Sequence, residues 1–372
     1  PDYAIWIGVE GRTGEYGDLS PAGHEARTAA ARAAAAKLSA EAPVDAVDEV
    51  TKTDLLAQLN LELESAELGL HLRDLNVIAS PAQGIRDSFD LMPTATDDNW
   101  ERIAERMSNV PGAVSGYIET LREGISRGIV PARRQVAEVA KQARKHANPA
   151  GFFGEFADSA AAEGGAELPA ALREGLRSGA AAASAAYGEL ADFLEKELAP
   201  SAGEQDGVGR DMYALHSRSF LGAEIDLDET YEWGIAELRR MIDEQTRTAG
   251  EIVPGASVEE AIAALEADPS RKLHGTKALQ EWMQETSDRA VADLAKTHFD
   301  IPDAIRRLEC MIAPTQEGGI YYTGPSDDFS RPGRMWWSVP EGVTEFDTWR
   351  ELTTVYHEGI PGHHLQIGQA TY

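Results

Sequence analysis

Residues 344–364 read TEFDTWRELTTVYHEGIPGHH and hold the densest group of reactive side chains in the sequence. Apolar side chains recur here at the spacing of one helix face: Phe346, Trp349, Leu352 and Tyr356. Thr344, followed three residues later by Asp347, predicts a capping box at the helix start. We therefore expect an active-site helix and metal motif over residues 344–366.

Histidines gather at the end of this expected helix. Three of the nine histidines in the chain, His357, His363 and His364, fall in the run HEGIPGHH beside Glu358. Zinc in hydrolytic sites is held by imidazole and carboxylate ligands, and a nearby glutamate accepts a proton from the water that the metal activates. We therefore predict Zn²⁺ as the cofactor, with the three histidines as candidate metal ligands and Glu358 as the candidate catalytic base. The alternative is a frayed helix end whose surface histidines are favoured by the helix dipole.

The spacing of this motif differs from the familiar zincin motif, in which the two histidines are four residues apart. Pro361 stands where the second histidine would be. Because proline has no backbone N–H and the two nearby glycines accept unusual dihedral angles, we expect the helix to bulge or break here. A break brings either His363 or His364 to the metal beside His357, and the spacing does not choose between them. The other histidine would orient a ligand or contact substrate.

Composition excludes several classes of protein. The 372 residues include 63 acidic and 34 basic side chains, for a net charge of −29. Because binding to a nucleic-acid backbone requires basic side chains, we expect neither a nucleic-acid partner nor an anionic membrane surface. The sequence has no run of about 20 apolar residues that would span a membrane. Its single cysteine, Cys310, favours a cytoplasmic location, unless a signal segment preceded Pro1 in a longer precursor.

Helices are expected to dominate the chain. Two apolar stripes illustrate the helical period, and we interpret both as core-facing: Leu56, Leu59, Leu63, Ala66 and Leu70, and then Tyr231, Ile235, Leu238 and Ile242. Alanine, the residue with the highest helix propensity, is abundant. We expect a single, predominantly helical domain over residues 1–372 that is a fragment of a longer chain. The sequence indicates nothing about the oligomeric state.

A short β ribbon is expected before the metal motif. Residues 320–323 and 335–339 are rich in aromatic and β-branched side chains, and turn formers lie between them. The predicted ribbon spans residues 318–339. Its first strand could bind an extended peptide along its edge.

Three side chains of the ribbon are candidate substrate-binding residues. One of Tyr321 and Tyr322 could donate a hydrogen bond to a developing oxyanion, although paired aromatic packing is the alternative. Arg331 could hold a peptide carboxylate with two hydrogen bonds, with Arg334 as the second choice. The alternative for both arginines is solvation beside the turn.

A family resemblance rests on residues 356–366, YHEGIPGHHLQ, preceded by residues 330–333, SRPG, and an aromatic strand. This pattern resembles the bacterial proteins grouped as domain-of-unknown-function family 885. That family is similar in fold to the carboxypeptidase Taq group of gluzincin metallopeptidases, so the resemblance implies a zincin-like, mainly α fold with a deep cleft.

The resemblance also implies a site with one zinc ion. His357 would be the first ligand, Glu358 the base, and the second ligand would lie within His363 and His364. A glutamate from a later helix supplies the third ligand in gluzincins. A Glu-Gly-Trp-Ala-Leu-Tyr-type segment suits that task in the family, and because the sequence has no such segment we expect this ligand after Tyr372.

Three functions are compatible with these features. The first is a zinc-dependent, carboxypeptidase-like metallopeptidase acting on a peptide substrate. The second is a non-catalytic helical protein that binds peptides. The third is a metal hydrolase of a non-peptide amide or ester. We expect the first.

Overall fold

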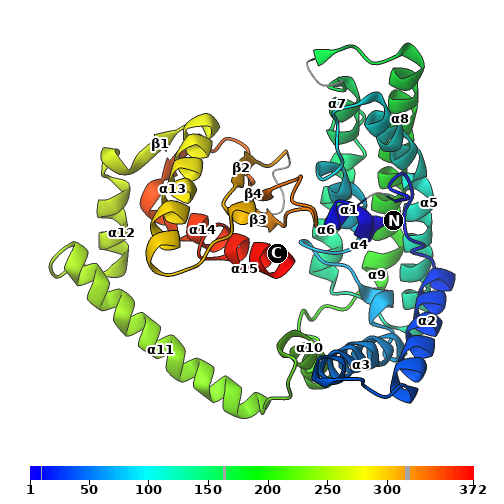
Figure 1. The fold of residues 1–372 in the computed structure, drawn as a ribbon, viewed down its shortest axis with the longest axis horizontal. Helices are drawn as coiled ribbons and strands as arrows, with labels where there is room; N and C mark the ends of the chain where they lie inside the picture. Colours follow the sequence, from blue (N-terminus) through cyan, green and yellow to red (C-terminus); the bar gives the residue numbers. More distant parts are fainter. Residues whose placement is uncertain (10, 162–164, 315–318) are drawn as a thin grey trace. The chain divides into compact units, whose positions relative to one another are not determined.

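The computed structural model describes residues 1–9, 11–161, 165–314 and 319–372. Helices dominate it, as the sequence predicted (Figure 1). Contacts group the chain into two compact units, Pro1–Ile5 with Glu10–Ile225, and Trp6–Val9 with Asp226–Tyr372. The sequence had predicted one helical domain over the whole length. No helix in the described residues is both long enough and apolar enough to cross a membrane.

The first unit is helical. After α1 (Asp2–Ile7), which opens the chain, its elements are α2 (Pro21–Ala40), α3 (Ala46–Glu67), η1 (Leu70–Arg73), α4 (Pro81–Asp87), η2 (Ser88–Asp90), α5 (Asp97–Arg127), α6 (Arg133–His146), α7 (Phe152–Asp158), α8 (Ala170–Phe193), the π-helical η4 (Leu194–Leu198), α9 (Ala199–Ser201) and α10 (Arg210–Leu221). The long helices α5 and α8 pack along each other (Figure 1). Their facing sides supply much of this unit's core: Ile103, Met107, Val114, Leu121, Leu176, Ala183, Tyr187 and Leu190.

A buried ion pair lies in this unit beside α4. The Arg86 guanidinium donates to both carboxylate oxygens of Asp90, at 2.8 Å each. The two side chains are 2% and 8% exposed. Arg86 also lies over the ring of Phe152, 4.0 Å from its centroid. Burial raises the pKa of Asp90 to about 6, although Arg86 opposes the shift.

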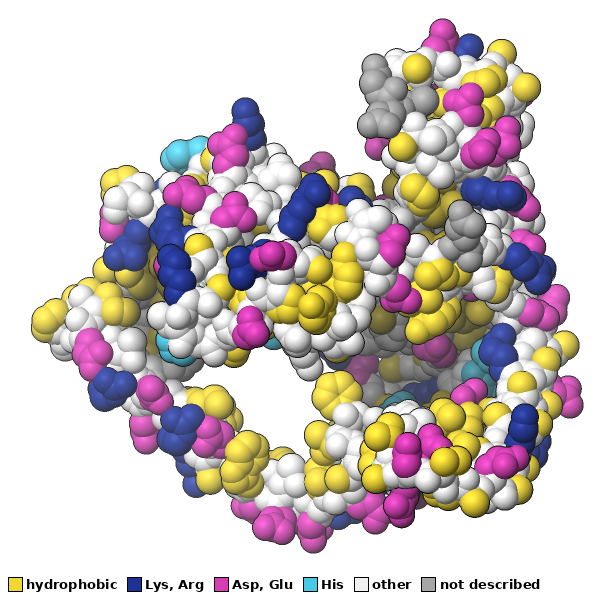
Figure 2. Space-filling view, viewed as in Figure 1, with side chains coloured by type: hydrophobic (Ala, Val, Ile, Leu, Met, Phe, Trp, Pro, Cys, Tyr) yellow, Lys and Arg dark blue, Asp and Glu magenta, His cyan; other side chains and the backbone are white. Residues whose placement is uncertain are grey.

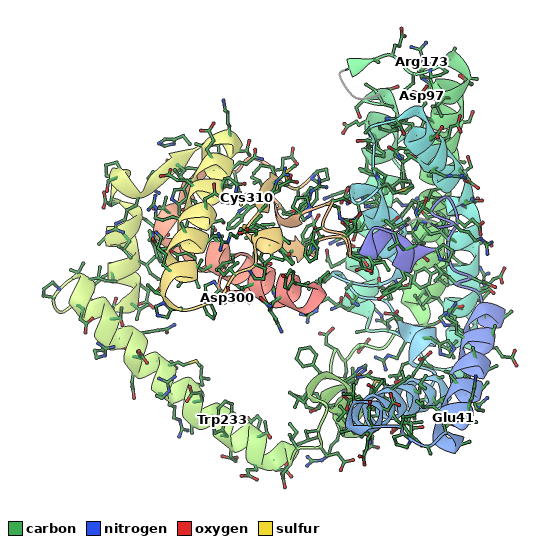
Figure 3. All side chains as sticks on the ribbon, in the orientation of Figure 1. Glu41, Asp97, Arg173, Trp233, Asp300 and Cys310 are labelled. Atoms are coloured by element: carbon green, nitrogen blue, oxygen red, sulfur yellow. The ribbon has the colours of Figure 1, made fainter. Side chains whose placement is uncertain are left out.

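The second unit combines helices with short strands. Its elements are α11 (Leu227–Ile252), α12 (Val258–Glu266), η5 (Pro269–Arg271), β1 (Lys272–His274), α13 (Thr276–Thr297), η6 (Asp303–Ile305), β2 (Leu308–Ile312), β3 (Ile320–Thr323), β4 (Gly333–Trp337), β5 (Glu345–Asp347), α14 (Thr348–Glu358) and α15 (His363–Thr371). Its core joins α13, the sheet and α14: Leu279, Met283, Leu308, Cys310, Met335, Trp337, Phe346 and Val355. Figure 3 labels Cys310 on β2.

The predicted ribbon is present, because β3 and β4 pair antiparallel with Tyr322 opposite Met335. Gly318, the first residue of the predicted ribbon, lies outside the described residues. The sequence did not predict β2, which pairs parallel with β4 on its other side. The outer edge of β2 is covered by α13, where Gln284 donates to the Leu308 carbonyl at 2.9 Å and accepts from the Cys310 N–H at 3.0 Å. These side chains satisfy backbone groups that an edge strand leaves unpaired.

The helix expected over residues 344–366 starts later than predicted. The capping box at Thr344 is wrong, because the residues after it form β5, which pairs with β1 and places Phe346 opposite Leu273. The Thr344 carbonyl accepts from the Gly275 N–H at 2.8 Å. Pairing to β1 therefore delays the helix, which begins at Thr348 with Asp347 as its N-cap.

The apolar stripe of α11 is exposed, although the sequence predicted that it faces a core. Tyr231, Leu238 and Ile242 are between 50% and 66% exposed. Figure 2 shows hydrophobic side chains along α11 among acidic and basic ones, and Figure 3 labels Trp233 on the same helix. The predicted helix is present here, but the prediction that its apolar stripe faces a core was wrong.

Candidate metal centre

The helix expected over residues 344–366 breaks between its histidines, as predicted. Helix α14 ends at Glu358, and α15 begins at His363. A β-carbon at Gly362 would collide with the His357 carbonyl oxygen, and one at Gly359 would lie 2.7 Å from the Val355 carbonyl oxygen. Only glycine allows the backbone to turn this closely on itself. The turn brings the start of α15 back toward the end of α14.

This turn gathers three side chains into a candidate metal centre. One ligand atom each from His357, Glu358 and His363 lie within 4.8 Å of one another. The His357 and His363 rings meet edge to face, with centroids 4.6 Å apart. Two imidazole nitrogens are zinc ligands in hydrolytic sites, and a carboxylate beside them can serve as the base.

Glu358 lies in an unusual environment for a carboxylate. Its side chain is buried, and within the described residues its Oε2 has no hydrogen-bond partner. Burial raises the pKa of Glu358, while His363 and His357 oppose the shift. A buried, unpaired carboxylate oxygen costs free energy unless a cation or a water satisfies it. The residues therefore fit a bound zinc ion.

His364 is turned away from this group and uses both of its ring nitrogens elsewhere. Its Nε2 lies 2.7 Å from the Ile305 carbonyl oxygen, and its Nδ1 lies 2.8 Å from the Tyr322 hydroxyl. The residue is 1% exposed, and burial lowers the pKa of its imidazole. Of the two histidines left open by the spacing, the structure brings His363 to His357.

The two tyrosines of the ribbon point to opposite faces, as neighbours in a strand do. Tyr322 lies beside the histidines, with its ring 6.4 Å from the His363 ring and nearly parallel to it. Burial raises the pKa of Tyr322. Tyr321 instead stacks on Trp336 at 6.1 Å, which is the aromatic packing weighed as the alternative. Only Tyr322 therefore belongs to the histidine cluster.

Arg331 makes structural contacts. Its guanidinium donates to the Trp6 carbonyl oxygen at 2.7 Å, and its backbone N–H donates to Ser326 Oγ at 3.0 Å. Burial lowers the pKa of Arg331. Arg334, the second choice, donates to Glu309 at 2.8 Å. These contacts of the two arginines hold the loop and the sheet, and carboxylate binding by Arg331 stays a prediction.

A small hollow lies on another part of α14. Its volume is about 260 Å³, and its lining includes Trp282 and Thr286 of α13 with Trp349, Leu352 and Tyr356 of α14. None of His357, Glu358 and His363 lines it.

The sequence matches a family described as bacterial protein of unknown function (DUF885) over residues 1–372. The chain belongs to DUF885. A comparison with curated proteins gave no match.

Two solved structures resemble the fold of this DUF885 chain. One, from Colwellia psychrerythraea, is described as a "putative lipoprotein"; it has 18% identity and a TM-score of 0.78, and the match covers 100% of this chain and 69% of that one. The other is described as a "putative lipoprotein of unknown function" from Shewanella oneidensis, with 17% identity, a TM-score of 0.61 and coverage of 98% and 68%. At these identities the likeness establishes the fold alone.

Two elements of this DUF885 site were missed in the sequence. The Ile305 carbonyl carries no side-chain signal, so no pattern could reveal it. Gly333 could have been found, because an isolated glycine in a strand often marks a close approach of other atoms. A β-carbon there would lie 2.6 Å from His364 Nδ1.

Proposed function

We propose that this DUF885 protein is a zinc-dependent, carboxypeptidase-like metallopeptidase. The observation that supports it most is the grouping of His357, Glu358 and His363 within 4.8 Å around a buried carboxylate. The proposal includes the gluzincin-like fold and the deep cleft that the resemblance implies. The third ligand, which the family resemblance implies to be a glutamate, stays a prediction.

His357, His363 and Glu358 would have different roles in the proposed reaction. His357 and His363 would hold the ion through ring nitrogens. A bound zinc ion supplies a positive charge that polarises a carbonyl oxygen and makes water more acidic. Glu358 takes a proton from the attacking water and returns it to the nitrogen of the leaving amine. Because burial raises the pKa of Glu358, its carboxylate is a stronger base than an exposed one.

Zinc content tests the ligands. We expect roughly one zinc ion per chain after dialysis, and loss of that ion in His357→Ala and in His363→Ala, because each removes an imidazole donor. Elemental analysis measures the content. His216→Ala, at an exposed histidine of α10, is the matched control and should retain the metal. Unchanged zinc in both ligand variants would overturn the site.

The cytoplasmic location also stays a prediction. It rests on the lone Cys310, which is buried and free of any disulfide. The solved neighbours are described as lipoproteins, so cell fractionation of the natural protein is the appropriate test.

A further inference from the structure

Helix α11 leaves an apolar stripe exposed (Figure 2). Of its 26 residues, all of which the structure describes, only Ala249 is buried. Tyr231, Leu238 and Ile242 of the stripe are between 50% and 66% exposed. Because apolar side chains that are grouped on a surface mark a site of interaction, this stripe is a candidate interaction surface.

The stripe has the spacing of a coiled-coil seam. Its members are Tyr231, Ile235, Leu238 and Ile242, which follow one another after four, three and four residues. A seam with a mean spacing of about 3.5 residues packs against a partner helix of the same spacing. Because each residue adds about 1.5 Å to the helix axis, this seam is about 16 Å long.

Two charged side chains of α11 stand apart from the others. Arg240 pairs along the helix with Glu237 at 2.6 Å and with Glu244 at 2.8 Å. Glu232 and Arg239 take part in no ion pair of the described residues. Their charges are therefore available to a partner.

Glu232 and Arg239 lie on the same edge of the stripe. Each directly follows a stripe residue, Tyr231 for the glutamate and Leu238 for the arginine. In a heptad that has Tyr231 and Leu238 as d positions, both are e positions, where charges determine the choice and the orientation of the partner helix. This edge thus carries one negative and one positive charge, seven residues apart.

An antiparallel second copy of α11 matches the apolar seam and the two charges in one register. Tyr231 then packs against the partner's Ile242, and Ile235 packs against the partner's Leu238. The same register brings Glu232 to the partner's Arg239, and the two-fold symmetry of such an interface repeats each contact. In a parallel copy the two charges would instead lie about 10 Å apart along the axis.

We propose that α11 is a self-association surface through which two copies of this chain form an antiparallel helix pair. Burial of the four stripe residues from each copy drives the association, and the two pairs of Glu232 with Arg239 set its direction. The seam is short, so the dimer is reversible. This inference does not depend on the proposed hydrolase function.

Sedimentation equilibrium of the 372-residue chain tests the association over about 1–200 μM protein, the range in which a weak dimer dissociates. Because the net charge of −29 makes copies repel one another, the salt is held at about 0.15 M, where charges are screened beyond about 8 Å. We expect the average mass to rise toward twice that of one chain. Leu238→Glu, which places a charge in the seam, should stay monomeric. A wild-type chain that is monomeric throughout would overturn the proposal.

Charge reversal tests the register. Glu232→Arg and Arg239→Glu each bring like charges together at two places in the dimer, so each alone should raise the dissociation constant about 10- to 100-fold. An equimolar mixture of the two variants should regain the wild-type value, because one copy then offers two positive charges and the other two negative ones. A mixture that associates no better than the separate variants would rule out the antiparallel pairing.

Arg240→Glu is the matched control. It makes the same change of charge as Arg239→Glu, but one residue further on, about 100° around the helix and away from the seam. Its dissociation constant should stay within about twofold of the wild type, since it alters only exposed pairs inside one helix. A loss as large as that of Arg239→Glu would trace the effect to net charge and overturn the pairing. Circular dichroism of each variant verifies that the helix is retained.

Discussion

Glu358→Gln is expected to lower kcat about 10²- to 10⁴-fold while the zinc content is unchanged. Glutamine has nearly the shape of glutamate, but its amide cannot accept the proton of the attacking water. Glu358 is buried between His357 and His363, and in the described part of the chain its Oε2 makes no hydrogen bond. The substitution therefore breaks no hydrogen bond of this oxygen within the described residues.

The measurement pairs single-turnover kinetics on a peptide with elemental analysis of the same sample. Glu351→Gln is the matched control, because Glu351 lies on the same helix and burial also raises the pKa of its carboxyl group. It should retain nearly all turnover. Full activity in Glu358→Gln would mean that another group is the base. Loss of zinc together with activity would make Glu358 a ligand.

Local signals predicted the body of the motif helix and its break, but not its start. The period of residues 344–366 indicated a helix, and Pro361 between two glycines indicated where it stops. Each of these signals acts within one or two turns of the chain. Sequence patterns are most informative about structure over that range.

Such local signals could not show whether His363 or His364 lies beside His357. It depends on the Ile305 carbonyl and the Tyr322 hydroxyl, which lie 59 and 42 residues from His364 in the chain. The parallel pairing of β2 with β4 was missed for the same reason. In both cases the partner that determines the structure is distant in sequence, so no local periodic pattern reveals it.

For α11, local spacing predicted the helix but not the exposure of its apolar stripe. Periodicity predicts a helix with an apolar face, but it does not name the surface that covers that face. Leu238 is 53% exposed in spite of its position on the stripe. Amphipathic spacing is thus a property of one helix, whereas burial also requires a second surface that covers its apolar face.

The second large effect is expected for Arg86→Met in the first unit. The pair it forms with Asp90 is buried on both sides, at 2% and 8% exposure. Methionine keeps much of the packing against Phe152 but leaves a buried carboxylate without its cation. Breaking such a pair costs about 3–5 kcal/mol in free energy of unfolding at neutral pH. Hydrogen exchange of α4 and α5 measures this loss in the unit that contains the pair.

The matched control is Arg102→Met. Arg102 pairs with Glu105, and the side chain of Arg102 is 63% exposed. An exposed pair contributes about 0–1 kcal/mol, so this variant should change exchange little. Equal losses in the two variants would mean that the Arg86 pair has no special role.

The loss in Arg86→Met should also depend on pH. Burial raises the pKa of Asp90 to about 6, above the unfolded value of about 3.9, so the folded unit binds more protons than the unfolded chain between these values. The contribution of Asp90 to stability is therefore fully present below about pH 4 and is lost as pH rises through about 6. Arg86 lowers the pKa of folded Asp90, so this pKa is higher in Arg86→Met. The free energy of unfolding of the variant therefore keeps falling to a higher pH than that of the wild type. The variant should differ less from the wild type at about pH 5 than at about pH 8, and a difference independent of pH would contradict a buried, titrating Asp90.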